Sequence, residues 1–200
     1  MPPLILASAS PRRAGLLEQI GLTFRVQPAD IDETVLAGES AAHYVERLAR
    51  EKAQRVASQN PVSLVLGSDT SVVLNGEILG KPASAAEAQA MLARLSGQTH
   101  QVMTAVALAQ GERCQSSLVV TGVSFRLLSE FEIRAYVASG EPMDKAGSYG
   151  IQGLGGIFVS ELRGSYSAVV GLPLQETAGL LAEAGHPVWH HWPCSKENPT

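Results

Sequence analysis

The sequence predicts an α/β protein, and three observations support this. A short aliphatic segment near the N-terminus runs directly into a helix start, several later helices open on a serine cap, and two β-rich segments are separated by a short polar turn. Hydrophobic residues make up 45% of the chain, with few aromatic residues, which suits tightly packed α/β layers. A length of 200 residues suits one domain, and we assign residues 1–185 to it and residues 186–200 to a C-terminal tail.

The first predicted unit is a strand followed by a helix. Residues 4–7 are short and aliphatic, as in a buried strand. Ser10 suits the N-cap of the next helix, Pro11 its first position, where no backbone N–H is needed, and Gly21 its end. We therefore expect a helix that begins directly after Ser10.

The junction between this strand and this helix carries Ser8, Arg12 and Arg13. A helix N-terminus presents unpaired backbone N–H groups and the positive end of the helix dipole, so these side chains could form an anion cradle. The alternative is an ordinary turn with two solvated arginines. The junction alone does not decide between the two interpretations.

An acidic, polar segment follows a second predicted strand. Residues 22–27 alternate enough for a strand, and residues 28–38 are typical of a loop that contains Asp30, Asp32 and Glu33. Such carboxylates keep a surface solvated, or they hold a hard divalent cation, which takes oxygen ligands. Both interpretations stay open.

A long helix is predicted from Ser40 to Ser58. Its apolar stripe includes Leu48, and Lys52 lies on the same stripe four residues later. A lysine on the inward face of a helix either extends along apolar surface to reach solvent or approaches a buried anion. Lys52 is therefore a candidate for binding an anion.

The most strand-like segment spans residues 62–67 and leads into Ser68-Asp69-Thr70. Functional groups in open α/β sheets gather beyond the carboxyl ends of strands, so we expect Asp69 to lie at such a position. An aspartate there could bind a metal or accept a proton from water, although aspartates also serve as turn and cap residues.

A hairpin is predicted directly after Asp69. The chain continues as a strand over residues 71–74, turns at the Asn-Gly pair 75–76 and returns over 77–79 before reaching Lys81. We expect this hairpin to present the Asp69 carboxylate and the Lys81 ammonium together.

The second half of the chain predicts further helices and strands. Helices are expected at 84–95, 129–138 and 173–183, and strands at 102–109, 118–125 and 157–162. The first two helices open with the Ser-x-x-Glu pattern of a capping box. Residues 144–156 are rich in glycine, but the spacing does not fit the dinucleotide-binding fingerprint, and the sequence contains no P-loop pattern.

Charge and cysteine content exclude several classes of protein. The net charge of −4 argues against stable nucleic-acid binding, which needs clustered Lys and Arg. No apolar segment approaches the length of a membrane span, and the N-terminal segment is too short for a signal peptide. Cys114 and Cys194 form no disulfide framework, so we expect a reduced, cytoplasmic setting.

The tail contains a histidine-rich tract with His190, His191 and Cys194. These residues could bind zinc in principle, but no paired Cys-x-x-Cys accompanies them. We interpret the tail as a docked or frayed terminus.

The polar residues singled out above favour chemistry at phosphorus. Cations clamp phosphate oxygens, and carboxylates hold Mg²⁺ or Mn²⁺. Acyl transfer would instead need a histidine or cysteine nucleophile in a suitable motif. The residues themselves predict a phosphate-binding α/β enzyme and do not name its substrate.

Seven motifs occur in an order that resembles the Maf family of nucleoside triphosphate pyrophosphatases, closest to its dTTP/UTP-specific branch. They are Ser8-x-Ser10-Pro11-Arg12-Arg13, Arg50-Glu51-Lys52-Ala53, Gly67-Ser68-Asp69-Thr70, Gly80-Lys81-Pro82, Leu95-Ser96-Gly97-Gln98-Thr99-His100, Lys145-Ala146-Gly147-Ser148-Tyr149-Gly150-Ile151-Gln152-Gly153 and Val170-Gly171-Leu172-Pro173. The match extends from residue 4 to about residue 181.

This resemblance implies hydrolysis of dTTP and UTP, or of modified pyrimidine nucleotides, between the α and β phosphates, which yields the monophosphate and pyrophosphate. It implies a mixed twisted sheet with flanking helices and two lobes around a central cleft, as in inosine triphosphate pyrophosphatases. It further implies a divalent cation, Mg²⁺ or Mn²⁺, and a homodimer.

The resemblance also assigns catalytic roles by position. Asp69 matches the general base and metal-linked carboxylate of the family, and Glu33 corresponds to a metal-site acid. Lys52 and Lys81 correspond to cations on the phosphate side.

The remaining matched positions concern substrate binding. Ser8 and Arg13 belong to the phosphate-binding loop of the family. Arg12, Thr70 and Gln152 match the dTTP/UTP type, whereas a 7-methyl-GTP-type relative would carry a Trp-like residue, Gln and Glu there. The amide of Gln152, which donates and accepts, suits the edge of uracil or thymine.

Two rival functions stay open at this point. A nucleotide-binding regulator of cell septation would use the same pocket without turnover. A phosphotransferase would move the γ-phosphate to an acceptor and leave a diphosphate instead of a monophosphate.

Overall fold

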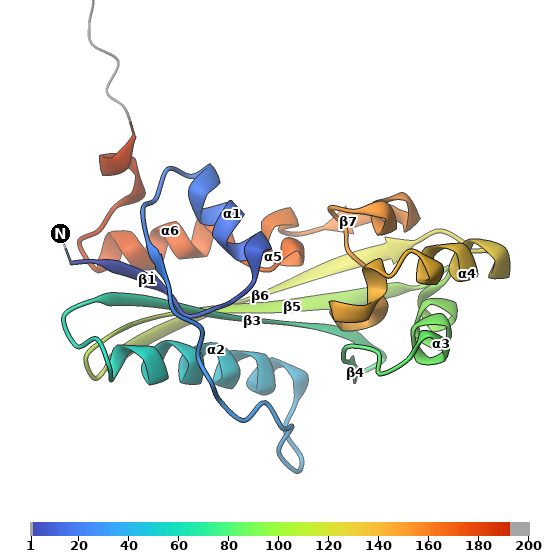
Figure 1. Ribbon diagram of the computed structural model, residues 1–200, viewed down its shortest axis with the longest axis horizontal. Coiled ribbons are helices and arrows are strands. Elements are labelled where there is room, and N and C mark those ends of the chain that lie inside the picture. Colours follow the sequence, from blue (N-terminus) through green and yellow to red (C-terminus); the bar gives the residue numbers. More distant parts are fainter. Residues whose placement is uncertain (1, 193–200) are drawn as a thin grey trace, which may run out of the picture.

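The computed structural model describes residues 2–192, and a seven-stranded sheet runs through its centre (Figure 1). The strands follow the order β2-β1-β3-β5-β6-β7, with β4 paired beside β3. Strand β1 pairs in parallel with β2 and β3, and the remaining pairs are antiparallel. The strand bounds are β1 Leu4–Leu6, β2 Arg25–Val26, β3 Leu64–Leu74, β4 Glu77–Leu79, β5 Thr99–Gln110, β6 Arg113–Phe125 and β7 Val159–Arg163.

Helices flank this sheet on both faces (Figure 1). α2 lies against one face, α1, α5 and α6 lie on the other side, and α3 packs with α4 at the far end of the sheet. The helix bounds are α1 Pro11–Gln19, α2 Ala41–Ala57, α3 Ala85–Leu95, α4 Glu130–Ala138, α5 Tyr166–Val170 and α6 Leu174–Glu183, with short 3₁₀ helices η1 Glu141–Asp144, η2 Ala146–Ser148, η3 Leu154–Phe158 and η4 Val188–His191. The predicted mixed sheet with flanking helices is confirmed. Within residues 2–192, no helix combines the length and the apolar character that crossing a membrane requires.

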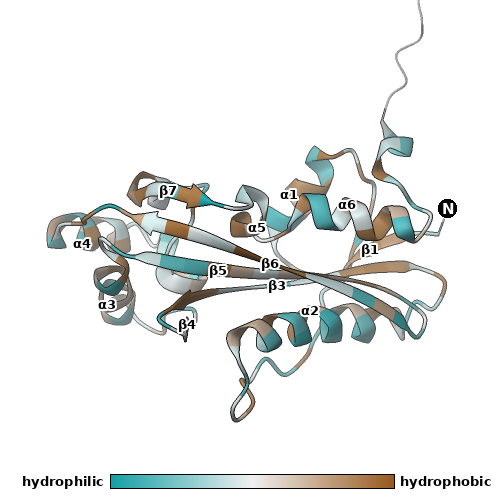
Figure 2. Ribbon diagram, turned by 180° about the vertical axis from the view of Figure 1, so that it is seen from behind, coloured by the Kyte–Doolittle hydropathy of each residue, from teal (hydrophilic) through white to brown (hydrophobic). Residues whose placement is uncertain are grey.

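Three clusters of buried apolar side chains hold these layers together. The first joins the sheet to α1 and α6, the second lies under α3 and α4, and the third lies under α2. Figure 2 shows hydrophobic colouring along the inner strands and hydrophilic colouring on much of α2. The first cluster includes Val188, so the chain still packs on the core just past residue 185, and the boundary between domain and tail stays a prediction.

Helix α2 lies unusually close to β3 because Gly67 leaves room for it. A Cβ atom at Gly67 would lie 2.3 Å from the carbonyl oxygen of Ala49 and 2.7 Å from the amide nitrogen of Ala53. Both are backbone atoms, which cannot turn aside as a flexible side chain would. This close packing brings Lys52, on the same face of α2, over the middle of β3.

The strand that contains Asp69 differs from the prediction. β3 is one strand of 11 residues, so Asp69 lies inside it rather than beyond its end. The reason is β5, which pairs with β3 from Val65 to Val73 and keeps it extended past the point where β1 stops. The predicted hairpin is confirmed, with φ of 52° at Asn75 and 84° at Gly76.

Several helix caps differ in detail from the predictions. Ser10 occupies the N-cap position of α1, but its side chain makes no capping hydrogen bond. The Glu87 carboxylate accepts from the Ala83 N–H instead of completing a capping box with Ser84. The capping box at Ser129 is complete. Strand β2 is shorter than expected, and the one-turn helix α5 has no counterpart among the predicted helices.

We expect Gly67→Ala to lower the free energy of unfolding by about 3 kcal/mol, the upper end of overpacking costs, because the new methyl group collides with the backbone of α2. Gly179→Ala is the matched control, since its Cβ would meet open space inside α6, and it should stabilise the fold by roughly 0.5–1 kcal/mol. Urea denaturation measures both changes. Equal stability of the Gly67→Ala variant and the unsubstituted protein would contradict the close packing of α2.

Candidate active site

The candidate site lies where β1 ends and β3 continues. Leu6, the last residue of β1, pairs with Leu66, and Asp69 follows three residues later along β3. Beyond Leu6 the chain turns into α1, so the N-terminus of α1 lies beside this part of β3 (Figure 1). Asp69 therefore does not lie beyond the end of its own strand, as predicted, but it does lie past the C-terminal end of the neighbouring strand β1.

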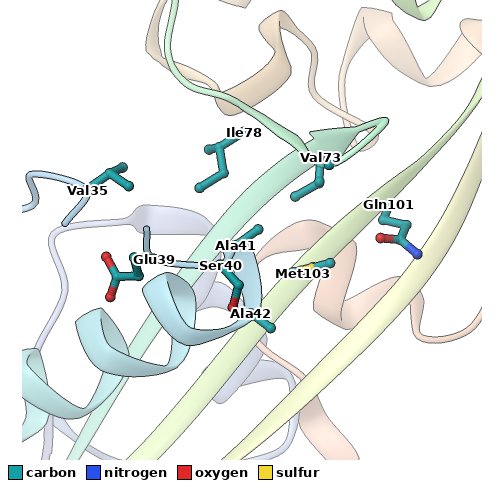
Figure 3. Close-up of a pocket in the computed structure, with 10 residues that line it drawn as sticks. Val35, Glu39, Ser40, Ala41, Ala42, Val73, Ile78, Gln101 and Met103 are labelled. Carbon is teal, nitrogen blue, oxygen red and sulfur yellow. The ribbon is translucent and has the colours of Figure 1, made fainter. Parts of the chain in front are cut away.

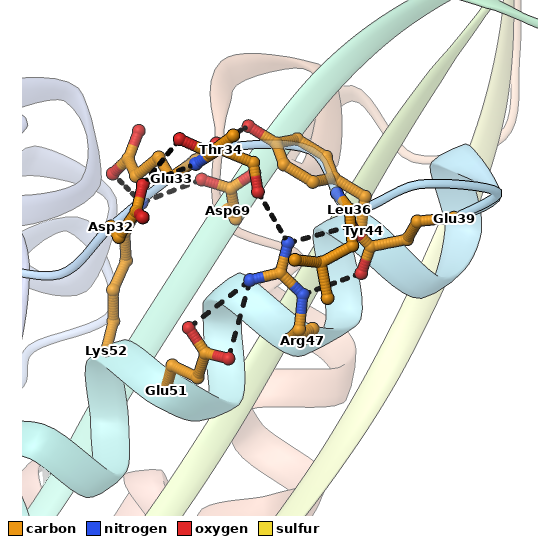
Figure 4. Close-up of polar contacts among 10 residues, drawn as sticks. All are labelled: Asp32, Glu33, Thr34, Leu36, Glu39, Tyr44, Arg47, Glu51, Lys52 and Asp69. Atoms are coloured by element: carbon orange, nitrogen blue, oxygen red, sulfur yellow. Dashed lines mark hydrogen bonds and ion pairs between the residues drawn. The ribbon is translucent and has the colours of Figure 1, made fainter.

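Lys52 joins two carboxylates at this place (Figure 4). Its ammonium nitrogen lies 2.8 Å from Oδ1 of Asp69 and 2.7 Å from Oε1 of Glu33. Lys52 and Asp69 are each only 8% exposed, whereas the Glu33 side chain is about half exposed. The structure thus decides between the two interpretations of Lys52: its side chain approaches a buried anion and does not extend to solvent.

The two carboxylates differ in their affinity for a proton. Burial raises the pKa of Asp69, and the charges of Lys52 and Arg13 oppose this shift only in part. Burial also acts to raise the pKa of Glu33, but the hydrogen bond and charge of Lys52 outweigh it, so that pKa lies below its ordinary value. Neighbouring carboxylates with pKa values pushed in opposite directions suit different roles, and Asp69 is the better proton acceptor of the two.

The acidic loop is held by residues that the sequence did not single out. Arg47 on α2 contacts both carboxylate oxygens of Glu39 and donates to the Thr34 carbonyl at 3.1 Å (Figure 4). The Tyr44 hydroxyl donates to the Glu33 carbonyl at 2.9 Å. Asp32 accepts from Thr34 within the loop itself. These contacts fix the loop so that Glu33 reaches Lys52.

Arg13 connects three distant segments next to this cluster. Its Nε donates to the carbonyl of Gly171 at 2.8 Å, its Nη1 to Oγ of Ser8 at 3.1 Å and its Nη2 to Oγ1 of Thr70 at 3.4 Å. Burial lowers the pKa of Arg13, and the charge of Asp69 opposes this effect. The junction after β1 is therefore a built cationic site and not an ordinary turn with two solvated arginines.

Arg12 points to a different place from Arg13. Together with Gln152 it lines a pocket of about 420 Å³ beside α1, whose other walls include Leu16 and Gln19. Its guanidinium also lies 4.0 Å from the carboxylate of Asp144. The structure thus brings Arg12 and Gln152 to one pocket, places Thr70 beside Arg13, and leaves the role of all three in base recognition a prediction.

Lys81 and Asp69, which the predicted hairpin was expected to present together, share no hydrogen bond or ion pair. Lys81 is exposed after β4, and within residues 2–192 its ammonium makes no hydrogen bond or ion pair. Its positive charge contributes to lowering the pKa of Glu33. After the turn, Leu79 of β4 pairs with Val72 of β3, so the chain returns toward Asp69, and the joint presentation of the two side chains stays a prediction.

A larger recess, of about 480 Å³, lies between the start of α2 and the strands β3, β4 and β5 (Figure 3). Val35, Val73, Ile78 and Met103 give it a largely apolar lining. Val73 and Asp69 are four residues apart on β3, so they face the same side of the sheet. The recess therefore opens beside the charged cluster, but none of the predicted site residues lines it.

The donor set limits how a metal can bind. In the described part of the chain, no group of three or more His, Cys, Asp or Glu side chains is arranged to hold a metal ion. Glu33 and Asp69 offer two carboxylates, a number that suits Mg²⁺ or Mn²⁺ when substrate phosphates supply further oxygens.

The tail makes a contact that the sequence did not predict. His191 lies against His186, with 3.1 Å between their Nε2 atoms, and Trp192 donates to the carbonyl of Ile20 at 2.9 Å. These contacts agree with a docked terminus up to Trp192. Cys194, the third candidate zinc ligand, lies outside the described residues.

Known sequences resemble this chain over most of its length. The family model described as Maf-like protein matches residues 3–184. A dTTP/UTP pyrophosphatase of Shigella sonnei (strain Ss046) is 59% identical over 183 residues, 91% of this chain and 93% of its own length. A dTTP/UTP pyrophosphatase of Myxococcus xanthus (strain DK1622) is 58% identical over 185 residues, 92% of this chain and 94% of its own length.

The fold is also shared with a solved structure. A HAM1 protein from Coxiella burnetii superposes with a TM-score of 0.52 at 19% identity, covering 92% of this chain and 100% of its own. That likeness concerns the fold alone. The family match and the two relatives, which extend over nine-tenths of the sequence, show that the chain belongs to the family of Maf-like proteins.

Proposed function

We propose that the chain hydrolyses dTTP and UTP to the nucleoside monophosphate and pyrophosphate. The observation that carries this proposal is the ammonium of Lys52 between Asp69 and Glu33, next to the Arg13 site at the start of α1. Cations and carboxylates at one helix N-terminus suit a triphosphate better than any neutral substrate. The printed names of the relatives, dTTP/UTP pyrophosphatase, support the choice of nucleotide.

In this proposal Asp69 accepts the proton of the water that attacks the α-phosphorus. Its raised pKa gives it more affinity for that proton than an exposed aspartate has. Lys52 orients the Asp69 carboxylate and then stabilises the charge that develops on the phosphates. We assign the pyrophosphate leaving group to two cations: Lys81, whose charge acts on Glu33, and Arg13, which donates to Ser8.

The carboxylates of Glu33 and Asp69 fit a divalent cation, and we propose Mg²⁺ or Mn²⁺. When bound, such an ion neutralises charge on the triphosphate and acts as a Lewis acid at phosphorus. Lys52 holds the two carboxylates within reach of one ligand, since both contact a single nitrogen atom.

We propose that the pyrimidine base enters the pocket between Arg12 and Gln152. The Gln152 amide can donate to and accept from the edge of uracil or thymine. Thr70 accepts hydrogen bonds from Arg13 and from Thr104, so it links the phosphate site to the wall of the sheet. We also propose a homodimer, which the family resemblance implies, and a cytoplasmic setting, which the cysteine content favours.

The products of the reaction test the proposed activity. Incubation with dTTP, UTP, CTP, ATP and GTP, each with Mg²⁺ or Mn²⁺, should release pyrophosphate and monophosphate most rapidly from dTTP and UTP. Binding without any product would favour the nucleotide-binding regulator, and a diphosphate product would favour a phosphotransferase.

We expect Asp69→Asn to reduce kcat by roughly 10²–10⁴-fold, the usual contribution of a general base, while the protein stays folded. Asp32→Asn is the control, because Asp32 lies in the acidic loop and its side chain, within residues 2–192, bonds only to Thr34. Initial rates of pyrophosphate release and a thermal melt check both variants. A nearly normal rate in the Asp69→Asn variant would contradict the assignment.

The two neighbouring arginines should differ in effect. We expect Arg13→Lys to raise KM for every triphosphate by a similar factor, about 10-fold, because it loses the forked contacts of the phosphate site. Arg12→Ala should mainly change the preference among dTTP, UTP and CTP, because Arg12 lines the base pocket. Steady-state kinetics on the three nucleotides measures this. If Arg12→Ala and Arg13→Lys both changed the KM of all three nucleotides by the same factor, the division of roles would be wrong.

A further inference from the structure

The loop that carries Gln152 is a tight turn. The N–H of Gly153 donates to the carbonyl of Gly150 at 3.2 Å, which closes a four-residue turn with Gln152 at its third position. We call residues 150–153 the Gln152 turn. Ile151 packs against both the first and the second apolar clusters, and Gln152 itself is exposed toward the pocket that Arg12 lines.

Two side chains from outside the turn hold both of its ends. The Tyr136 hydroxyl, at the end of α4, accepts from the N–H of Gly150 at 3.1 Å and donates to Oε1 of Glu141 at 2.8 Å. Just past the turn, the N–H of Leu154 donates to Oε2 of Glu141 at 2.9 Å, and the N–H of Gly155 donates to Oε1 at 3.1 Å. Tyr136 and Glu141 thus act as one unit, which we call the clamp.

The backbone of this segment lies directly on the clamp. A Cβ atom at Gly153 would lie 2.4 Å from Oε2 of Glu141, and one at Gly155 would lie 2.7 Å from the Tyr136 hydroxyl. Neither glycine has a positive φ, so the requirement there is for space and not for a special backbone conformation. The clamp therefore fixes where the turn sits as well as satisfying its N–H groups.

The protonation of the clamp is suited to this contact. Burial acts to raise the pKa of Glu141, but the N–H groups of Leu154 and Gly155 and the Tyr136 hydroxyl outweigh it, so the pKa lies below its ordinary value. Burial, with the bond to Glu141, raises the pKa of Tyr136. Near neutral pH the pair is a carboxylate acceptor and a phenol donor, and hydrogen bonds to a charged group are the stronger kind.

We infer that Glu141 and Tyr136 are positioning residues for base recognition: they hold Gln152 at a fixed distance from Arg12 across the base pocket. The role in base recognition rests on the proposed function, whereas the effect on the Gln152 turn rests on the hydrogen bonds described above. Glu141 is not among the residues that line the pocket, and its carboxylate oxygens accept from the backbone N–H groups that follow the turn. A looser turn would weaken discrimination by the base while leaving Asp69 and Lys52 in place.

The test compares Glu141→Gln with Glu132→Gln. Glu132 is the matched control, because it too accepts from a backbone N–H, at Ser129, and from side chains of Ser129 and Arg126, but does not contact the turn. Hydrogen–deuterium exchange of the peptide that contains residues 150–155 reports the turn directly. We expect exchange there to be about 10-fold faster in Glu141→Gln and unchanged in Glu132→Gln, since a hydrogen bond to a charged group is lost.

Kinetics then tests the consequence. In Glu141→Gln, KM for dTTP and UTP should rise about 10-fold and their advantage over CTP should shrink, while kcat changes less than about 3-fold. The double variant Glu141→Gln with Gln152→Ala should have no higher KM than Gln152→Ala alone, because the effect passes through Gln152. Unchanged exchange in Glu141→Gln, additive effects in the double variant, or an equal loss for all nucleotides would each overturn the inference. If the unsubstituted protein releases no pyrophosphate from either nucleotide, the proposed function fails. The exchange result alone then tests whether the clamp holds the Gln152 turn.

Discussion

The shared ammonium of Lys52 is the interaction on which the rest of the site depends. A buried carboxylate without a partner costs several kcal/mol, so Asp69 can remain in the middle of β3 only because Lys52 reaches it. Lys52 reaches it because α2 lies close to β3, and α2 can do so because Gly67 has no side chain. The same nitrogen then binds Glu33 and anchors the acidic loop. The absence of a side chain at Gly67 thus lets Lys52 reach Asp69, and the contacts of Arg47 and Tyr44 bring Glu33 to the same nitrogen.

The start of α1 shows how neighbouring residues acquire different tasks. The guanidinium of Arg13 donates hydrogen bonds to Gly171, Ser8 and Thr70. These bonds link the N-terminal junction, β3 and the segment after α5. Arg12, one residue earlier, faces a pocket that it shares with Gln152. Adjacent positions on a helix point about 100° apart, so one junction serves both a phosphate site and a base pocket. The clamp of Glu141 and Tyr136 completes this arrangement from the opposite wall.

Features set by neighbouring residues could be predicted from the sequence, and features set by distant pairing could not. The helix starts at Ser40 and Ser129, the Asn-Gly hairpin and the inward face of Lys52 follow from local rules and are confirmed. The position of Asp69 inside β3 depends on β5, which lies some 35 residues away in the chain. The bond from Arg13 to Gly171 spans 158 residues.

The central claim is that water attacks the α-phosphorus beside Asp69 and Lys52. Hydrolysis of UTP in ¹⁸O-labelled water, followed by mass spectrometry of the products, tests this most directly. The account predicts one ¹⁸O atom in each UMP and none in the pyrophosphate, because the bond that breaks joins the α-phosphorus to the bridging oxygen. Label in the pyrophosphate, or UDP and labelled phosphate as products, would contradict it.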